Sequence, residues 1–203
     1  VFQPNWMVEG LATYIETDKE KAVGRGQSSM FEMMMRVEVN SGIKPINQVN
    51  LRNTDWPINQ SYLYGEHFYR FIAENYGEEK VVQLSDEYGN DLMPLFINRN
   101  AKKVLGKDLT QLWSEFSDYL KLRYQPQIKQ INENTIVEGD NVTQEGFYTQ
   151  VVEATESGFY YLRRNNTEPS MLMFQDKLGQ CEEIVEISSS ANLDWHPQAG
   201  LLI

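Results

Sequence analysis

The chain has 203 residues, and its 41% hydrophobic and 12% aromatic content is that of a globular protein and excludes a disordered one. The formal net charge of -11 argues against a nucleic-acid or anionic-membrane surface, because phosphate binding needs clustered Lys and Arg. The single cysteine, Cys181, excludes an internal disulfide and a cysteine-based zinc site, and no apolar run approaches the roughly 20 residues of a membrane span.

Residues 1–126 are predicted to form an all-α part. Its first helix should begin after Asn5. Apolar side chains recur at helical spacing and predict the stripe that faces the core: Met7, Leu11, Tyr14 and Ile15. Glu9 and Glu16 fall on another face, with small residues between them that would let a ligand approach.

Further helices are predicted over residues 30–39, over about 18 residues that end at Gly77, and over 78–88, 91–105 and 108–123. In the helix before Gly77, the apolar stripe is expected to hold Tyr64, Phe68, Phe71 and Ile72. Tyr62 is expected to project to a different side, together with Glu66 and Tyr69. His67 faces neither side cleanly and is expected to be partly exposed.

After Pro126 the character of the sequence changes. Residues 129–203 carry 12 acidic and 4 basic side chains, which supports a boundary near Pro126 and two domains, 1–126 and 127–203. Strand-like runs at 146–152, 158–164, 170–175 and 182–187 are separated by turn residues and predict an antiparallel β-meander. The expected fold class is therefore α+β, with the helices and the strands in two segregated parts.

The segment from Pro4 to Tyr14 resembles the second zinc-ligand helix of the gluzincin metallopeptidases, the aminopeptidase-N-like superfamily. In that family a Trp-x-x-Glu-Gly-Leu/Phe-Ala-x-Tyr segment follows a His-Glu-x-x-His helix. The resemblance implies that Glu9 is a zinc ligand in the intact protein. A zinc peptidase needs two imidazoles, one carboxylate and an open position for water. Neither His67 nor His196 lies in a His-Glu-x-x-His and neither is assigned a metal, so that motif is expected before Val1.

Tyr62-Leu63-Tyr64-Gly65 resembles the Tyr-x-x-Gly segment of the same family, whose Tyr donates a hydrogen bond to the oxyanion of the tetrahedral intermediate. The resemblance implies that role for Tyr62. An interface tyrosine with a solvated hydroxyl is the alternative interpretation. The family often has Lys where this chain has Tyr64.

Two acidic residues of the first helix also keep alternative interpretations. Glu9 could instead be a carboxylate that the helix dipole favours near a helix N-terminus. Glu16 lies about 10 Å from Glu9 along the helix axis, which is too far to share one zinc ion. It is interpreted either as a substrate-amine or outer-shell residue or as a solvated surface acid.

The last residues, 190–203, resemble the repeat of TolB-like β-propellers, in which Leu-x-Trp-Ser-Pro-Asp-Gly-x-x-Ile turns one strand into the next. Here the corresponding stretch contains Leu193, Trp195 and Pro197, with His196 in place of Ser. The resemblance implies that the β-meander forms one to two propeller blades of about 40 to 45 residues each. It also implies a periplasmic or secreted location.

These resemblances together imply a fragment of a zinc-dependent metallopeptidase, which hydrolyses peptide bonds of a peptide or protein substrate with a metal-activated water. The chain alone is expected to bind no zinc and to be inactive, because the His-Glu-x-x-His motif is absent. Its partners would be the rest of its own polypeptide, namely that motif and further propeller blades. The second hypothesis is a non-catalytic protein-binding scaffold, and the third is an unrelated helical domain.

Overall fold

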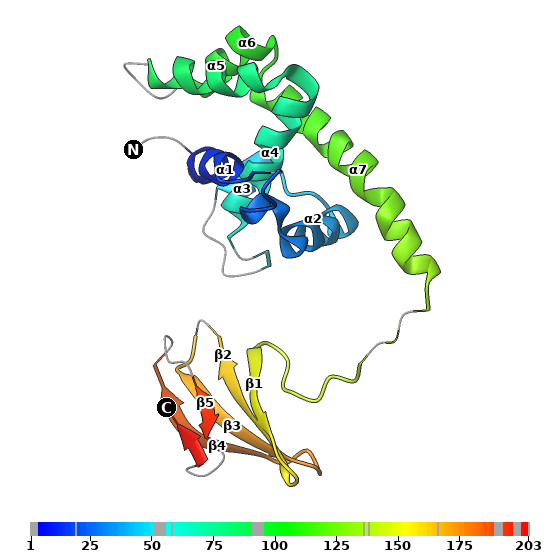
Figure 1. The fold of residues 1–203 in the computed structure, drawn as a ribbon, viewed down its shortest axis with the longest axis vertical. Coiled ribbons are helices and arrows are strands. Elements are labelled where there is room, and N and C mark those ends of the chain that lie inside the picture. The colour runs from blue at the N-terminus through cyan, green and yellow to red at the C-terminus, as the bar shows by residue number, and fades with distance from the viewer. Residues whose placement is uncertain are drawn as a thin grey trace. The chain divides into compact units, whose positions relative to one another are not determined.

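The computed structural model describes residues 4–18, 20–50, 56–57, 59–90, 96–135, 137, 139–165, 167–188, 193–196 and 200–202. Its helices are α1 (Asn5–Ile15), the 3-10 turn η1 (Arg25–Gln27), α2 (Ser29–Ser41), α3 (Ile46–Val49), α4 (Gln60–Tyr76), α5 (Glu78–Gly89), α6 (Ile97–Leu105) and α7 (Leu109–Glu133). Its strands are β1 (Tyr148–Ala154), β2 (Gly158–Arg164), β3 (Ser170–Asp176), β4 (Cys181–Ile187), β5 (Asp194–His196) and β6 (Gly200–Leu202). Helices come first and strands second, so the α+β class with segregated parts is confirmed (Figure 1).

The chain divides into two compact units, Val1–Ile136 and Val137–Ile203. The division falls later than the boundary expected near Pro126, because α7 continues through Pro126 to Glu133. A proline inside a helix removes one backbone hydrogen bond, here the bond to the carbonyl of Leu122. Leu122 is 79% exposed, so water can satisfy that carbonyl. No helix in the described part of the chain is both long and apolar enough to cross a bilayer.

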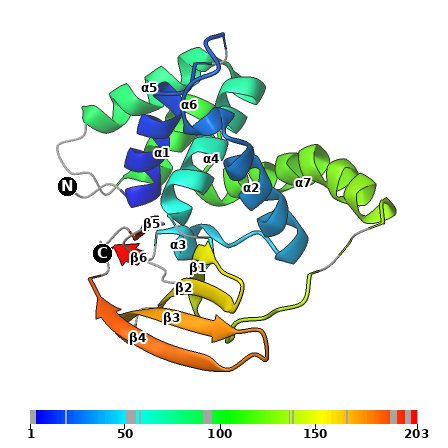
Figure 2. The ribbon, with the colours of Figure 1, turned by 60° about the horizontal axis from the view of Figure 1, so that its bottom comes forward.

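Helix α4 is the centre of the helical unit. Every residue from Leu63 to Ile72 is buried, and α4 runs between α1 and α2 (Figure 2). Glu66 and Tyr69, which were expected on a different side from the apolar stripe, are buried as well. Other elements cover this part of α4 on all sides, so polar as well as apolar positions are buried there. The apolar stripe alone therefore does not predict which of its residues are buried.

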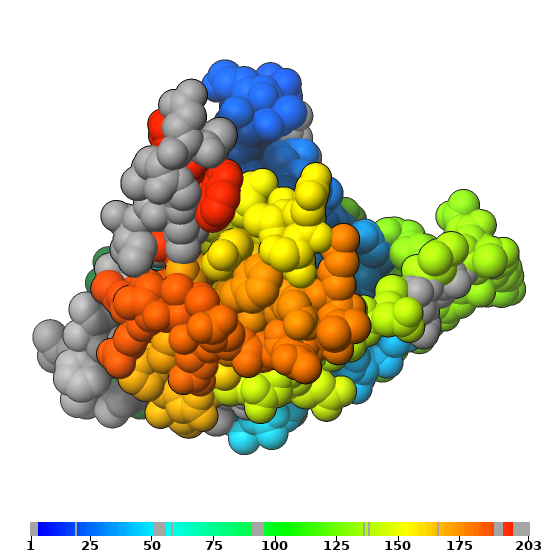
Figure 3. Space-filling view, turned by 90° about the horizontal axis from the view of Figure 1, so that it is seen from below, coloured from blue at the N-terminus to red at the C-terminus, as the bar shows by residue number. Residues whose placement is uncertain are grey.

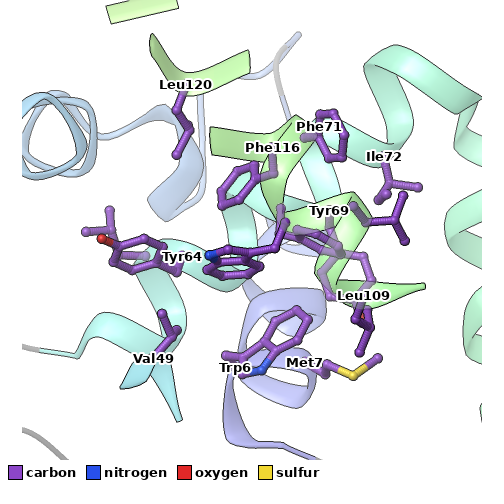
Figure 4. Close-up of a cluster of buried hydrophobic side chains, with 14 of the residues drawn as sticks. Trp6, Met7, Val49, Tyr64, Tyr69, Phe71, Ile72, Leu109, Phe116 and Leu120 are labelled. Carbon is purple, nitrogen blue, oxygen red and sulfur yellow. The ribbon is translucent and has the colours of Figure 1, made fainter. Parts of the chain in front are cut away.

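Aromatic side chains from three helices form the core around α4 (Figure 4). Trp6 of α1 packs edge-on against Phe68 of α4, with ring centroids 5.2 Å apart. Trp113 of α7 stacks on Phe68 at 5.6 Å and meets Phe116 at 5.0 Å. Each such ring pair adds about 0.5 to 1.5 kcal/mol beyond the burial of its apolar area. The aromatic cluster thus ties α1 and α7 to α4.

Helices α1 and α4 touch through backbone at Gly10 and Gly65. A Cβ atom on Gly10 would lie less than 3.0 Å from three backbone atoms of Gly65, and a Cβ on Gly65 would clash with the Trp6 carbonyl. The face of α1 that this contact buries consists of Trp6, Met7, Gly10 and Thr13. The expected stripe is therefore correct in part: Met7 is buried and Leu11 and Tyr14 pack against the core, but Ile15, which was expected in the core, is 71% exposed. Close backbone approach selects the smallest side chains, which hydrophobic periodicity does not register.

Arg70 of α4 is a buried cation with three anionic or carbonyl partners. Its Nε and Nη2 donate to Glu66 Oε1 at 3.0 and 2.6 Å. Its Nη1 donates to Glu32 Oε1 at 2.8 Å, and its Nη2 also donates to the Gly26 carbonyl at 2.7 Å. One guanidinium therefore ties together α4, α2 and η1, and its fork geometry suits these several acceptors.

His67, expected to be partly exposed, is fully buried beside this network. The single hydroxyl hydrogen of Tyr124 goes to Glu32 at 2.6 Å, so His67 Nε2, 2.9 Å from the Tyr124 oxygen, must donate to it. His67 Nδ1 lies 2.8 Å from the Leu63 carbonyl and 3.0 Å from Glu66 Oε2, which are both acceptors. The buried ring therefore lies within hydrogen-bonding distance of Tyr124, the Leu63 carbonyl and Glu66.

The second unit is an antiparallel sheet with the order β1-β2-β3-β4, so the predicted meander is confirmed. Leu162, Leu172 and Ile187 form its small core. Strand β5 adds Trp195, which stacks on Tyr160 of β2 with centroids 5.6 Å apart. The residues of β4 up to Glu186 are exposed, and the orange atoms of β3 and β4 form one broad surface in Figure 3.

Gly65→Ala is expected to lower the free energy of unfolding of the helical unit by about 3 kcal/mol, because the added methyl forces α1 away from α4. The measurement is urea unfolding followed by helical circular dichroism. The control is Gly89→Ala at the exposed end of α5, where a Cβ meets nothing within 4 Å. It should change stability by less than about 1 kcal/mol and in the stabilising direction. Equal losses in the two variants would contradict the close crossing.

Stability should also fall between pH 4.5 and pH 2 because of Glu32. Burial opposes ionisation of this carboxyl, yet hydrogen bonds from Tyr124 and Arg70 hold its pKa at about 2, below the ordinary 4.5. A lowered folded-state pKa stabilises the fold above pH 4.5, and this contribution disappears as the pH falls towards 2. Urea midpoints between pH 2 and 7 should therefore fall less steeply for Glu32→Gln than for the wild type. Exposed Glu79→Gln should keep the wild-type slope.

Candidate functional site

The crossing of α1 and α4 brings the two residues singled out from the sequence together. Glu9 directly precedes Gly10, and Tyr62 lies one turn before Gly65, so both stand beside the glycine contact. The interaction of the Tyr62 hydroxyl with the Glu9 carboxylate is the main cause that raises the pKa of Tyr62 above 10, with burial second. Both side chains are half-buried. A carboxylate and a phenol from distant parts of the sequence thus form one cluster.

Arg25 of η1 completes the cluster, and the sequence analysis assigned it no role. Its guanidinium carbon lies 4.7 Å from the centre of the Tyr62 ring. Its Nε and Nη2 donate to the two carboxylate oxygens of Glu16 at 2.5 and 3.0 Å. The hydrogen bond from Arg25 lowers the pKa of Glu16, and the charge of Arg25 opposes the rise in the pKa of Tyr62. Glu16 therefore reaches the cluster through Arg25.

The backbone around η1 explains why Arg25 returns to Glu16 and α1. Asp18 and Val23 pair as an isolated antiparallel bridge that turns the chain back. Gly24 then has a φ of 94°, a conformation that glycine adopts without strain. Gly26 is buried, and its N–H donates to Thr17 Oγ1 at 3.1 Å. The only sequence signal for Arg25 is its position between these two glycines. That signal predicts a loop but does not predict which residues Arg25 contacts.

Metal binding needs more ligands than this cluster offers. In the described ranges, no three side chains of His, Cys, Asp or Glu are grouped so that they could hold a metal ion. Glu9 can supply one carboxylate oxygen, whereas a zinc site needs three protein ligands. The described residues therefore do not make a zinc site by themselves, and the chemistry of the cluster is limited to acid, phenol and guanidinium groups.

Two cavities of the helical unit lie elsewhere. One has a volume of about 650 Å³ and is lined by α1, α4 and α5, and the other, of about 310 Å³, is lined by η1, α2, α4 and α7. Glu9 and Tyr62 line neither of them. The Glu9–Tyr62 cluster is thus a surface site beside the crossing, separate from both cavities.

Comparison with known proteins gives no relative for this chain: no protein-family model matches it, and neither a curated protein nor a solved structure is significantly similar.

The cluster makes opposite predictions for the pKa of Tyr62 in two variants. Glu9→Gln should lower it towards 10, because the acceptor that stabilises the protonated phenol loses its charge. Arg25→Gln should raise it further, because the nearby positive charge is lost. NMR titration of tyrosine labelled with ¹³C at Cζ measures both values. Shifts in the same direction would refute the arrangement.

Proposed function

We propose that this chain belongs to a gluzincin-like zinc metallopeptidase and supplies two parts of its active site. Glu9 would be one of the metal ligands, and Tyr62 would be the donor to the oxyanion. The observation that supports this most strongly is the contact between the two residues at the Gly10–Gly65 crossing. A coincidental match of two short motifs gives no reason for their key side chains to meet in space.

The chemistry of each residue suits its proposed role. A carboxylate is an ordinary zinc ligand, and Glu9 is half-buried on a helix, which fixes its direction. Tyr62 has a raised pKa, so its phenol keeps its hydrogen at neutral pH and can donate to a developing oxyanion. A preorganised donor of this kind lowers the barrier by about 3 kcal/mol. The remaining ligands and the general base would come from the rest of the polypeptide.

Arg25 and Glu16 would act as positioning residues. Arg25 packs on the face of the Tyr62 ring and thereby restricts the direction of its hydroxyl. Glu16 holds Arg25 with two hydrogen bonds. Among the interpretations of Glu16 from the sequence, an outer-shell role fits best, because its carboxylate is engaged by Arg25 and cannot also face a substrate amine at full charge.

The test uses the polypeptide in which this chain occurs, purified with zinc. Glu9→Gln should weaken zinc binding at least about tenfold, because one ligand is lost. Tyr62→Phe should keep its zinc and lose about 100-fold in kcat on a peptide substrate. Zinc content by mass spectrometry and hydrolysis rates separate the two effects.

Tyr76→Phe is the matched control for Tyr62→Phe. Tyr76 also lies on α4 and also donates to a carboxylate, that of Glu115, but at the opposite end of the helix. Its loss should change kcat by less than about twofold. A polypeptide without zinc or hydrolytic activity, or equal effects of the two tyrosine variants, would overturn the proposal.

A non-catalytic protein-binding scaffold is the second candidate function. One observation favours it: Glu9, Tyr62, Arg25 and Glu16 already satisfy one another, as the residues of a structural cluster do. The zinc measurement decides between the two candidates, since a scaffold would bind no zinc at the cluster.

We also propose that the sheet β1-β2-β3-β4 is a propeller blade and that β5 and β6 begin the next one. A four-stranded antiparallel meander is the architecture of a blade, and the stacking of Trp195 on Tyr160 joins β5 to it. A periplasmic or secreted location accompanies this proposal.

A further inference from the structure

The cavity of about 650 Å³ is lined by residues of α1, α4 and α5 and of the turn that follows α1. Leu11, Ile15, Val81 and Val82 give it apolar walls, and Tyr14 contributes a hydroxyl. Its volume falls in the range of small-molecule sites. Ile15 is 71% exposed and Val82 59% exposed, so large apolar side chains stand at the cavity in contact with water. Covering them would bury apolar area and favour an occupant with a hydrocarbon part.

The charges that line this cavity are mostly negative. Asp18, Glu66 and Glu78 line it, against one cation, Arg70. Asp18 is paired with Lys21 at 2.9 Å. Glu78 forms no ion pair within the described ranges, so its charge remains uncompensated.

Glu66, which also lines the cavity, adds a second observation. Its side chain is about 1% exposed, and its Oε1 receives hydrogen bonds from Arg70. Its Oε2 lies 3.0 Å from His67 Nδ1, and that nitrogen also lies 2.8 Å from the Leu63 carbonyl. Within the described residues Oε2 receives no hydrogen bond. A buried carboxylate oxygen without a donor is costly, and a donor that approaches from the cavity would reduce that cost.

The pKa of the Tyr14 hydroxyl indicates the sign of the electrostatic potential in the cavity. Burial raises the pKa of Tyr14, and the negative charges of Glu78, Glu66 and Glu74 raise it further, while only Arg70 opposes them. The potential at this wall is therefore negative, and it disfavours a second anion and favours a cation.

We propose that this cavity binds a primary ammonium group on a short alkyl chain, as in an alkyl amine or a lysine side chain. The chain would lie against Leu11, Ile15 and Val82, and the ammonium group would face Glu78 and Glu66. The site does not include Glu9 or Tyr62, so this proposal is independent of the proposed peptidase function.

The experiment titrates the full chain in 0.15 M salt with n-hexylammonium and with N-acetyl-lysine amide, and follows the methyl groups of the cavity walls by NMR. The matched probes without charge are 1-hexanol and N-acetyl-norleucine amide, and hexanoate carries the opposite charge. The cationic probes are expected to shift the methyl signals of Ile15 and Val82 and to bind at least about tenfold more tightly than their matches. The tighter of the two cationic probes identifies a free amine or a lysine side chain as the source.

Two substitutions on the first turn of α5 form a matched pair. Glu78→Lys and Glu79→Lys change the net charge equally, and both side chains are exposed, but only Glu78 lines the cavity. Glu78→Lys should weaken hexylammonium binding about tenfold or more, whereas Glu79→Lys should stay within about twofold because salt screens a charge outside the site. Thermal melts check that both variants fold. Equal losses, equal affinity for hexanol, or no methyl shifts would each overturn the proposal.

Discussion

The backbone contact between Gly10 and Gly65 is the constraint on which the helical unit depends. It lets α1 lie directly on α4, and only at that distance can Trp6 reach Phe68 and Trp113 to form the aromatic core. The same contact sets the spacing between the residues that flank the two glycines. Packing and the candidate site therefore share one cause, and a methyl group at the crossing would disturb both.

The sequence predicted which segments form helices and strands better than it predicted which faces are buried. The end of α4 before Gly77 and the antiparallel meander follow from glycine and alternation signals. Helix α1 begins at Asn5 and not after it, with Pro4 at the N-cap position. The buried face of α1 was predicted only in part, because it also includes Gly10 and Thr13, which carry no hydrophobic signal. Periodicity also could not show that α4 is surrounded by other helices.

The candidate site was predictable only in part, and for a physical reason. Glu9 and Tyr62 belong to short motifs whose glycines need a close partner, and each motif could be recognised in its own stretch of sequence. Arg25 reaches the Tyr62 ring through a turn whose course depends on a single bridge, Asp18 to Val23, and on the conformation of Gly24. No periodic or compositional pattern encodes such a path, so the contact of the Arg25 guanidinium with the Tyr62 ring is visible only in the structure.

The position of Arg25 depends on the core more than on its own ion pair. Its bond with Glu16 lies at the surface, where ion pairs contribute about 0 to 1 kcal/mol. The η1 turn that contains Arg25 is fixed by a buried residue. Arg70 donates to the Gly26 carbonyl of this turn and also binds Glu66 and Glu32. Removing a partner of such a buried charge costs about 3 to 5 kcal/mol, several times the worth of a surface pair. The position of Arg25 over the Tyr62 ring therefore depends on the buried hydrogen bonds and ion pairs of Arg70.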